Sequence, residues 1–147
     1  MKKKNFKNEF GEIEVFEKST DDCIIVKSKN SVIRLDLNLG LADYGDLNDE
    51  EGCGICVSGF FQELFDLCDV EITCDEYNLI PSNKTHKLTV MFSDVLVVFN
   101  TKKSTIDFNF SKSNRNFKVN PYIIYKIMND NYNHNKYDLK LYEKNAA

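Results

Sequence analysis

The sequence has no tryptophan, only two prolines among 147 residues, and no long apolar run. Its apolar runs, such as residues 95–99, are far shorter than the roughly 20 residues that a helix needs to cross a bilayer. The lysines at positions 2–4 are followed by polar residues, where a signal peptide would place its apolar stretch. The sequence therefore predicts a soluble protein without a membrane partner, located in the cytoplasm.

The cysteines do not fit the disulfide framework of a small secreted domain. Their number is odd, and the chain shows no secretory signal. They are Cys23, Cys53, Cys56, Cys68 and Cys74. Because disulfides persist mainly in oxidising compartments, we expect these five thiols to be reduced.

Positive charge is missing from the middle of the chain. Between Leu35 and Asn83 there is no lysine or arginine, yet the same stretch carries twelve carboxylates. They are Asp36, Asp43, Asp46, Asp49, Glu50, Glu51, Glu63, Asp66, Asp69, Glu71, Asp75 and Glu76. Exposed like charges repel each other within a Debye length of about 8 Å. The compensating cations must therefore come from elsewhere in the fold or from a partner.

The two halves of the chain differ in the sign of their charge. Residues 1–75 hold 8 Lys and Arg against 17 Asp and Glu, whereas residues 76–147 hold 11 against 6. The formal net charge is −4, which does not favour general affinity for nucleic acid. Lysine outnumbers arginine 17 to 2, as in proteins encoded by AT-rich genomes, and we take this to indicate a bacterial or phage origin.

Alternation of polar and apolar residues predicts short strands in the first third of the chain. The segments 12–17, 23–27 and 31–37 follow the two-residue period and are separated by turn residues. They are expected to form an antiparallel meander. Residues 40–54 show no period and are rich in Gly, Asp and Glu, which predicts a surface loop.

Two helices are predicted among further strands. Residues 59–69 repeat apolar side chains at helical spacing, with Ser58 as the expected cap and an acidic outer face. Asn120 followed by Pro121 predicts the start of a second helix, which continues to about Asp130. The remaining strands are predicted at 70–77, 87–92, 95–100, 105–111 and 137–142. The pattern favours a single α+β domain over 1–147, a mostly antiparallel β-sheet of about seven to eight short strands with two amphipathic helices packed on it.

Motifs that would indicate catalysis are missing. Neither His86 nor His134 stands near a recognisable nucleophile motif, and no phosphate-binding glycine motif occurs. Counted from Asp46, the acidic segment has Glu51 where a calcium-binding EF-hand loop needs glycine, and Val57 where it needs glutamate. The sequence therefore favours a protein that is not an enzyme and uses no cofactor.

A thiol or zinc site is the alternative interpretation. Cys53 and Cys56 have the spacing of a redox dithiol directly before a predicted helix. They also have the spacing of a zinc knuckle that Cys68 and Cys74, or His86, would complete. However, Cys68 lies on the apolar face of the predicted helix, where cysteine usually acts as a small hydrophobe. These residues are kept as weak metal candidates only.

The second half of the chain interleaves cations with aromatic residues, a mixture that grooves for single-stranded nucleic acid also use. These residues include Lys102, Lys103, Phe108, Phe110, Lys112, Arg115, Phe117, Lys118, Tyr122, Tyr125 and Lys126. The sequence pI of about 5.2 argues against nucleic-acid binding, because a basic footprint is expected of such proteins.

The acidic segments instead favour a small binding protein that neutralises a basic protein partner, such as a nuclease or a toxin, in the manner of immunity or phage anti-defence proteins. The residues expected at the interface are Asp43, Tyr44, Asp46, Asp49, Glu50, Glu51, Glu63, Asp66 and Asp69. Tyr44 is the expected aromatic anchor. Besides a protein built around Cys53 and Cys56, a structural or scaffolding subunit remains an alternative.

Overall fold

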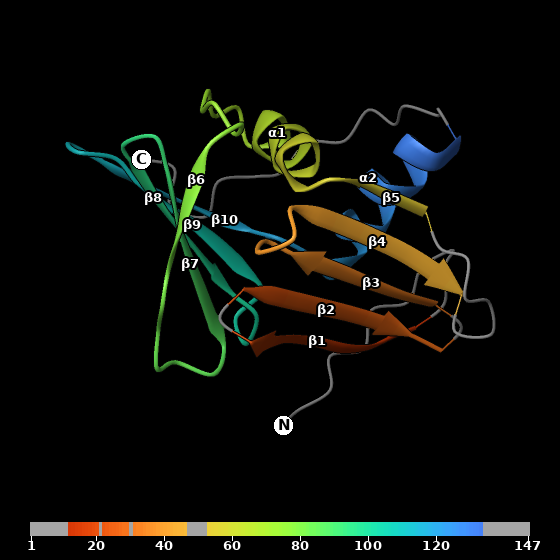
Figure 1. Cartoon of the computed structure of the whole chain (residues 1–147). Coiled ribbons are helices and arrows are strands. Elements are labelled where there is room, and N and C mark those ends of the chain that lie inside the picture. Colours follow the sequence, from red (N-terminus) through yellow and green to blue (C-terminus); the bar gives the residue numbers. More distant parts are fainter. Residues whose placement is uncertain (1–11, 21, 30, 47–52, 134–147) are drawn as a thin grey trace.

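The computed structural model describes residues 12–20, 22–29, 31–46 and 53–133. Two meanders of five antiparallel strands follow each other along the chain, and each meander is followed by a helix (Figure 1). The first unit consists of β1 (Ile13–Thr20), β2 (Cys23–Ser28), β3 (Ser31–Asp36), β4 (Leu41–Asp46), β5 (Cys53–Cys56) and α1 (Val57–Leu67). The second consists of β6 (Tyr77–Ile80), β7 (Lys87–Phe92), β8 (Val95–Asn100), β9 (Thr105–Asn109), β10 (Asn114–Lys118) and α2 (Pro121–Asn133).

The α+β class is confirmed, but the predicted sheet is wrong in number and layout. The described residues form ten strands in two sheets, ordered β1-β2-β3-β4-β5 and β10-β9-β8-β7-β6. Each strand pairs only with its neighbours in sequence, as a meander requires. A run of strand patterns shows which segments are extended, but it does not show where one sheet ends and the next begins.

Several element boundaries also differ from the prediction. The expected loop at 40–54 contains β4 and β5, and the expected strand at 70–77 forms a strand only from Tyr77. The strand β10 was not predicted, and the expected strand 137–142 lies outside the described residues. The N-cap of α1 is Cys56 rather than Ser58, and no side chain caps the helix by a hydrogen bond.

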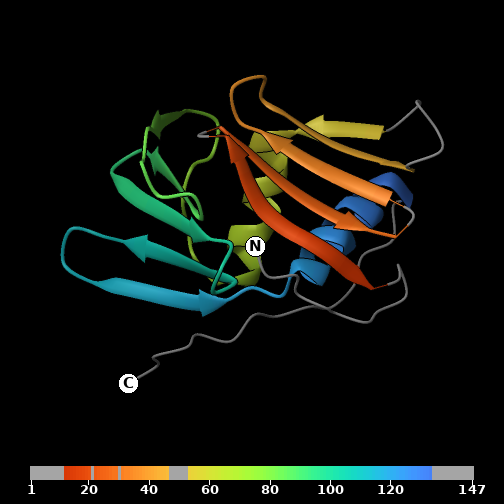
Figure 2. The same ribbon diagram turned by 90° about the horizontal axis from the view of Figure 1, so that it is seen from below.

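The helix α1 joins the two sheets through its apolar face. It contacts β4, β5 and α2. It lies between the two sheets (Figure 2). Phe65 lies edge-on to Phe92 and Phe108, with ring centroids 5.2 and 5.0 Å apart, and Phe61 contacts Phe99 at 5.8 Å. The helical spacing of these phenylalanines thus places one continuous stripe in the core between the sheets.

The helix α2 packs on the first sheet, although it follows the second one in the chain (Figure 2). Tyr125 is fully buried and hydrogen-bonds to the β2–β3 hairpin. The helix α1 thus contacts both sheets, and α2 covers the first sheet. The two helices therefore connect the two meanders.

Candidate protein-interaction surface

Exposed carboxylates gather where α1 ends and the chain runs toward β6. All five residues are exposed, and they lie within eleven consecutive positions. They are Asp66, Asp69, Glu71, Asp75 and Glu76, and we call this surface the acidic strip. Three of them, Glu71, Asp75 and Glu76, were not among the residues expected at an interface.

The backbone conformation after α1 determines which side chains of the strip face solvent. Asp69 adopts a positive φ of 56°, a conformation that ends helices, and the N–H of Val70 donates to the carbonyl of Phe65 at 3.0 Å. From there to Glu76 the chain forms neither helix nor strand, and alternate residues are buried. The buried positions are Val70, Ile72 and Cys74. The residue that follows each of them is exposed, and two of these three, Glu71 and Asp75, are acidic.

The electrostatic environment of Cys74 shows how close the carboxylates are to one another. Burial, together with the charges of Asp66 and Asp75, raises the pKa of this thiol to about 12. Both carboxylates thus act on one buried thiol, although nine positions separate them in the sequence. The end of α1 and the extended segment therefore form one negative surface.

A single arginine supports this surface from the second sheet. The guanidinium of Arg115 donates to the backbone carbonyls of Cys68 and Asp69, at 3.3 and 3.1 Å. These are carbonyls at the C-terminus of α1, where a positive charge is favourable. Arg115 also lies over the ring of Phe117, 5.2 Å from its centroid. Arg115 therefore stabilises the C-terminal end of α1, where the acidic strip begins.

The structure separates Asp43 from Tyr44. Asp43 is on the outer face of the first sheet, directly opposite Arg34 in the register of β3 and β4. Tyr44 is half-buried on the opposite face, with its ring edge-on to Tyr125 at 5.8 Å. Successive residues of a strand point to opposite faces, so these two cannot belong to one contact surface. Tyr44 is thus a half-buried residue that packs against the core.

The other expected interface residues fall into two groups. Glu63 and Asp66 lie on α1, where Asp66 accepts a hydrogen bond from Gln62 at 3.3 Å, and Asp69 follows the helix. Asp46 ends β4, and its side chain lies outside the described part. Asp49, Glu50 and Glu51 also lie outside the described residues. Of the expected interface residues, the described part of the chain thus places Glu63, Asp66 and Asp69 together, on and directly after α1.

The strand β5 keeps Cys53 and Cys56 apart. They pair with Tyr44 and Leu41 of β4, at the two ends of the strand. A rise of about 3.3 Å per residue puts their Cα atoms about 10 Å apart. A disulfide needs Cα atoms at about 4.4–6.8 Å, so in this conformation the pair does not form a dithiol of the redox type. Within the described part of the chain, no three His, Cys, Asp or Glu side chains are placed to share a metal ion.

We expect alkaline pH to destabilise the protein in part through Cys74. Its pKa rises from 9.0 to about 12, so the folded chain keeps the thiol protonated where the unfolded chain ionises it. The stabilising contribution is complete below pH 9 and is lost as the pH rises toward 12. The urea midpoint should therefore fall less steeply above about pH 9 in Cys74→Val than in the wild type. Parallel pH profiles of the two proteins would contradict this assignment.

Cations gather at the other end of the second sheet. Desolvation and the charges of four neighbouring lysines lower the pKa of His86. The lysines are Lys84, Lys87, Lys102 and Lys103. Lys87 pairs with Asn100 at the end of β7 that is distant from Tyr77, where the acidic strip stops. The acidic strip and this lysine cluster therefore lie toward opposite ends of the second sheet.

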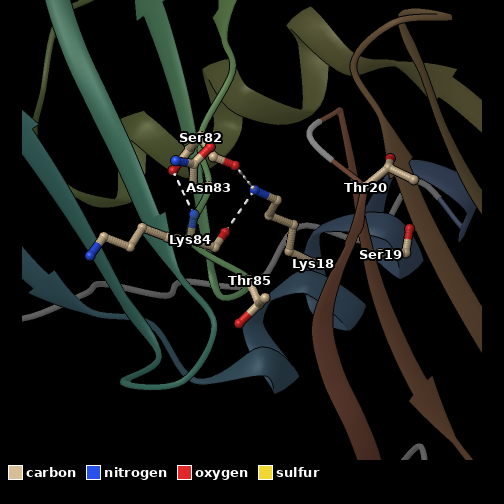
Figure 3. Close-up of a pocket in the computed structure, with 7 residues that line it drawn as sticks. All are labelled: Lys18, Ser19, Thr20, Ser82, Asn83, Lys84 and Thr85. Atoms are coloured by element: carbon tan, nitrogen blue, oxygen red, sulfur yellow. Dashed lines mark hydrogen bonds between the residues drawn. The ribbon is translucent and has the colours of Figure 1, made fainter.

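The pocket found among the described residues lies between the two sheets, near this basic end (Figure 3). It is an open hollow of about 410 Å³ lined by Lys18, Ser19, Thr20 and residues 82–85. The ammonium group of Lys18 donates to the carbonyls of Ser82, Lys84 and Lys87, at 3.3, 2.9 and 3.0 Å. An ammonium group has three protons, so these carbonyls use its donors. Lys18 therefore ties β1 to the β6–β7 loop rather than offering a charge to a ligand.

No helix in the described part of the chain is long and apolar enough to span a membrane. Comparison of the chain with models of protein families, with curated proteins and with solved structures gives no significant match. The function is therefore inferred from the acidic strip and its surroundings.

Proposed function

We propose that this protein is a small, non-catalytic binding protein that captures a basic protein partner, such as a nuclease or a toxin, and neutralises it by occupying its cationic site. The observation that carries the proposal is the acidic strip, five exposed carboxylates held on an ordered scaffold in a stretch of sequence without lysine or arginine. A cleft that binds phosphates presents the complementary charge.

The scaffold favours a binding role because it holds the carboxylates in place before a partner arrives. The buried side chains of Val70, Ile72 and Cys74 fix the extended segment from beneath. Arg115 fixes the end of α1 through two carbonyl groups. A preorganised charged surface loses little conformational entropy on binding, and charge complementarity accelerates encounter with the partner.

Neutralising the strip should slow association with the partner. In the variant Asp66→Asn, Glu71→Gln, Asp75→Asn, Glu76→Gln, the association rate at low salt is expected to fall by about tenfold or more, because the steering field is lost. Asp69 stays unchanged, since it ends the helix at positive φ. The partner is a basic protein retained from a native lysate at low salt, released at high salt and then purified. Association is measured by stopped-flow fluorescence at several salt concentrations.

A control removes charge elsewhere. The variant Glu12→Gln, Glu14→Gln, Glu17→Gln neutralises three carboxylates on and next to β1. It should bind at nearly the wild-type rate. The activity of the partner should fall to zero at a stoichiometric ratio with the wild type. Equal rates for the two variants, or a partner that stays fully active when bound, would refute the proposal.

A further inference from the structure

The turn between β3 and β4 exposes a leucine on a firmly held backbone. Leu39 is 73% exposed, the largest exposed fraction among the large hydrophobic side chains of the described residues. Its N–H donates to a carboxylate oxygen of Asp36 at 2.9 Å, and Gly40 follows at φ 71°, a conformation that favours glycine. The turn therefore holds an apolar side chain in solvent by specific local bonds.

The residues on both sides of Leu39 are also held by long-range hydrogen bonds. The N–H of Leu37 donates to the carbonyl of Asp22 at 2.7 Å, and its carbonyl accepts from the hydroxyl of Tyr77 at 2.6 Å. The carbonyl of Gly40 accepts from the N–H of Val57, the first residue of α1, at 2.9 Å. Elements of both sheets and α1 thus meet at this turn, which preorganises Leu39 for contact.

Further apolar surface continues from the turn onto the outer face of the first sheet. Leu41 is 37% exposed, and it pairs with Cys56, whose side chain is also exposed. Gly54 leaves room beside them, because a Cβ there would lie 3.0 Å from the Leu41 side chain and from the carboxylate of Asp43. We call Leu39, Leu41 and Cys56 the leucine patch.

The charges next to the leucine patch are mainly negative. Asp36 bonds to the turn itself, and Asp43 lies beside Leu41. On the side of the second sheet, Glu76 ends the acidic strip directly before Tyr77, whose hydroxyl contacts the turn. Arg34 of β3 stands opposite Asp43, but the carboxylates of Asp36 and Asp43 outnumber this cation beside the patch, so the apolar contact would lie in a net negative environment.

We propose that the leucine patch docks an amphipathic basic segment of the partner, whose apolar stripe covers Leu39 and Leu41 while its flanking lysines or arginines meet Asp36 and Asp43. This proposal rests on the proposed capture of a basic partner and adds the apolar contact that gives affinity. Central apolar contacts surrounded by polar residues commonly dominate the energy of an interface, whereas rim charges mainly set the association rate.

The test uses two synthetic helical peptides of equal charge, one with lysines flanking a leucine stripe and one in which glutamines replace the leucines. Binding to the full chain is measured by fluorescence anisotropy. The lysine–leucine peptide should bind more tightly, and Leu39→Gln should weaken its binding by about tenfold or more, as expected for loss of a buried leucine contact. The matched control Ile80→Gln changes a side chain that is 38% exposed on β6 and should leave binding unchanged.

The outcomes separate this inference from the proposed function. If Leu39→Gln binds like the wild type while the strip variant loses binding, the leucine patch is not the docking site and capture by charge stands. If the two peptides bind equally well, or neither binds, the inference is also overturned. A wild-type dimer in sedimentation velocity that dissociates in Leu39→Gln would show that a second copy covers the patch, which likewise overturns it. Unchanged unfolding midpoints for both leucine and isoleucine variants exclude a folding defect.

Discussion

Replacement of Phe65 by alanine is expected to lower the free energy of unfolding by about 3–5 kcal/mol, the usual cost of removing a fully buried phenylalanine. The ring of Phe65 has no solvent exposure and lies 5.0–5.6 Å from the rings of Phe61, Phe92 and Phe108. Because these neighbours belong to α1 and to two strands of the second sheet, the cavity would open at the contact that joins the helix to that sheet.

Equilibrium unfolding in urea, followed by circular dichroism, measures this effect. Phe110→Ala provides a matched control, because Phe110 is half-buried and stacks on Phe108 with ring centroids 6.4 Å apart. It removes the same atoms from a less enclosed site, so its cost should be clearly smaller. Equal costs for the two variants would mean that α1 does not depend on this contact for its attachment to the second sheet.

The buried face of α1 could be predicted from the sequence because it follows from one helix alone. The apolar residues of the predicted stripe, which include Phe60, Leu64 and Cys68, are all buried. A period of 3.6 residues fixes which side chains share a face, whatever the helix packs against. The period does not identify the surface that the helix covers, so the contact of α1 with both sheets and of α2 with the first sheet could not be inferred from it.

The segment 40–54 was mistaken for a loop because β4 lacks a regular alternation of apolar and polar residues. Its interior includes Ala42, Asp43 and Gly45, which have little intrinsic preference for strands. Pairing with β3, in the register Leu35 opposite Ala42, supplies the hydrogen bonds that make it a strand. Tertiary pairing thus decides an element that local propensity does not.

The opposite error concerns residues 70–75, which carry two of the three unexpected residues of the acidic strip. Their alternation is real, since Val70, Ile72 and Cys74 are buried and the residues between them are exposed. Alternation reports that one side of the chain is buried, but not that another strand pairs with it. A strand predicted at 70–77 gives no reason to join Glu71 and Asp75 to the acidic face of the helix.

The attachment of α2 to the first sheet leads to the last prediction. The Tyr125 hydroxyl accepts from the N–H of Ser28 at 3.1 Å and from the hydroxyl of Ser31 at 3.2 Å. Its single proton has two carbonyls within reach, that of Ser31 at 3.1 Å and that of Val26 at 3.4 Å. A phenol has one proton and two lone pairs, so two accepted bonds and one donated bond satisfy it. All the groups involved are buried, and water therefore does not replace the hydroxyl readily.

Tyr125→Phe is expected to lower the free energy of unfolding by about 1–3 kcal/mol, because the N–H of Ser28 and the carbonyl of Ser31 lose a partner in a buried site. The ring itself stays, so its edge contact with Tyr44 and its packing are kept. Urea unfolding gives the total effect, and hydrogen exchange of the Ser28 amide, which should become faster, locates it at the hairpin.

A double-mutant cycle distinguishes a coupled network from independent bonds. Ser31→Ala removes a hydroxyl that lies 2.9 Å from the Ser28 hydroxyl and donates to Tyr125. In a coupled network, the effects of Tyr125→Phe and Ser31→Ala should differ from additivity by more than about 0.5 kcal/mol. Additive effects would show that packing of the Tyr125 ring, and not its hydroxyl network, holds α2 on the sheet of the other half. Coupling at this point would locate the attachment of α2, the helix that follows the second meander, in a buried network on the first sheet.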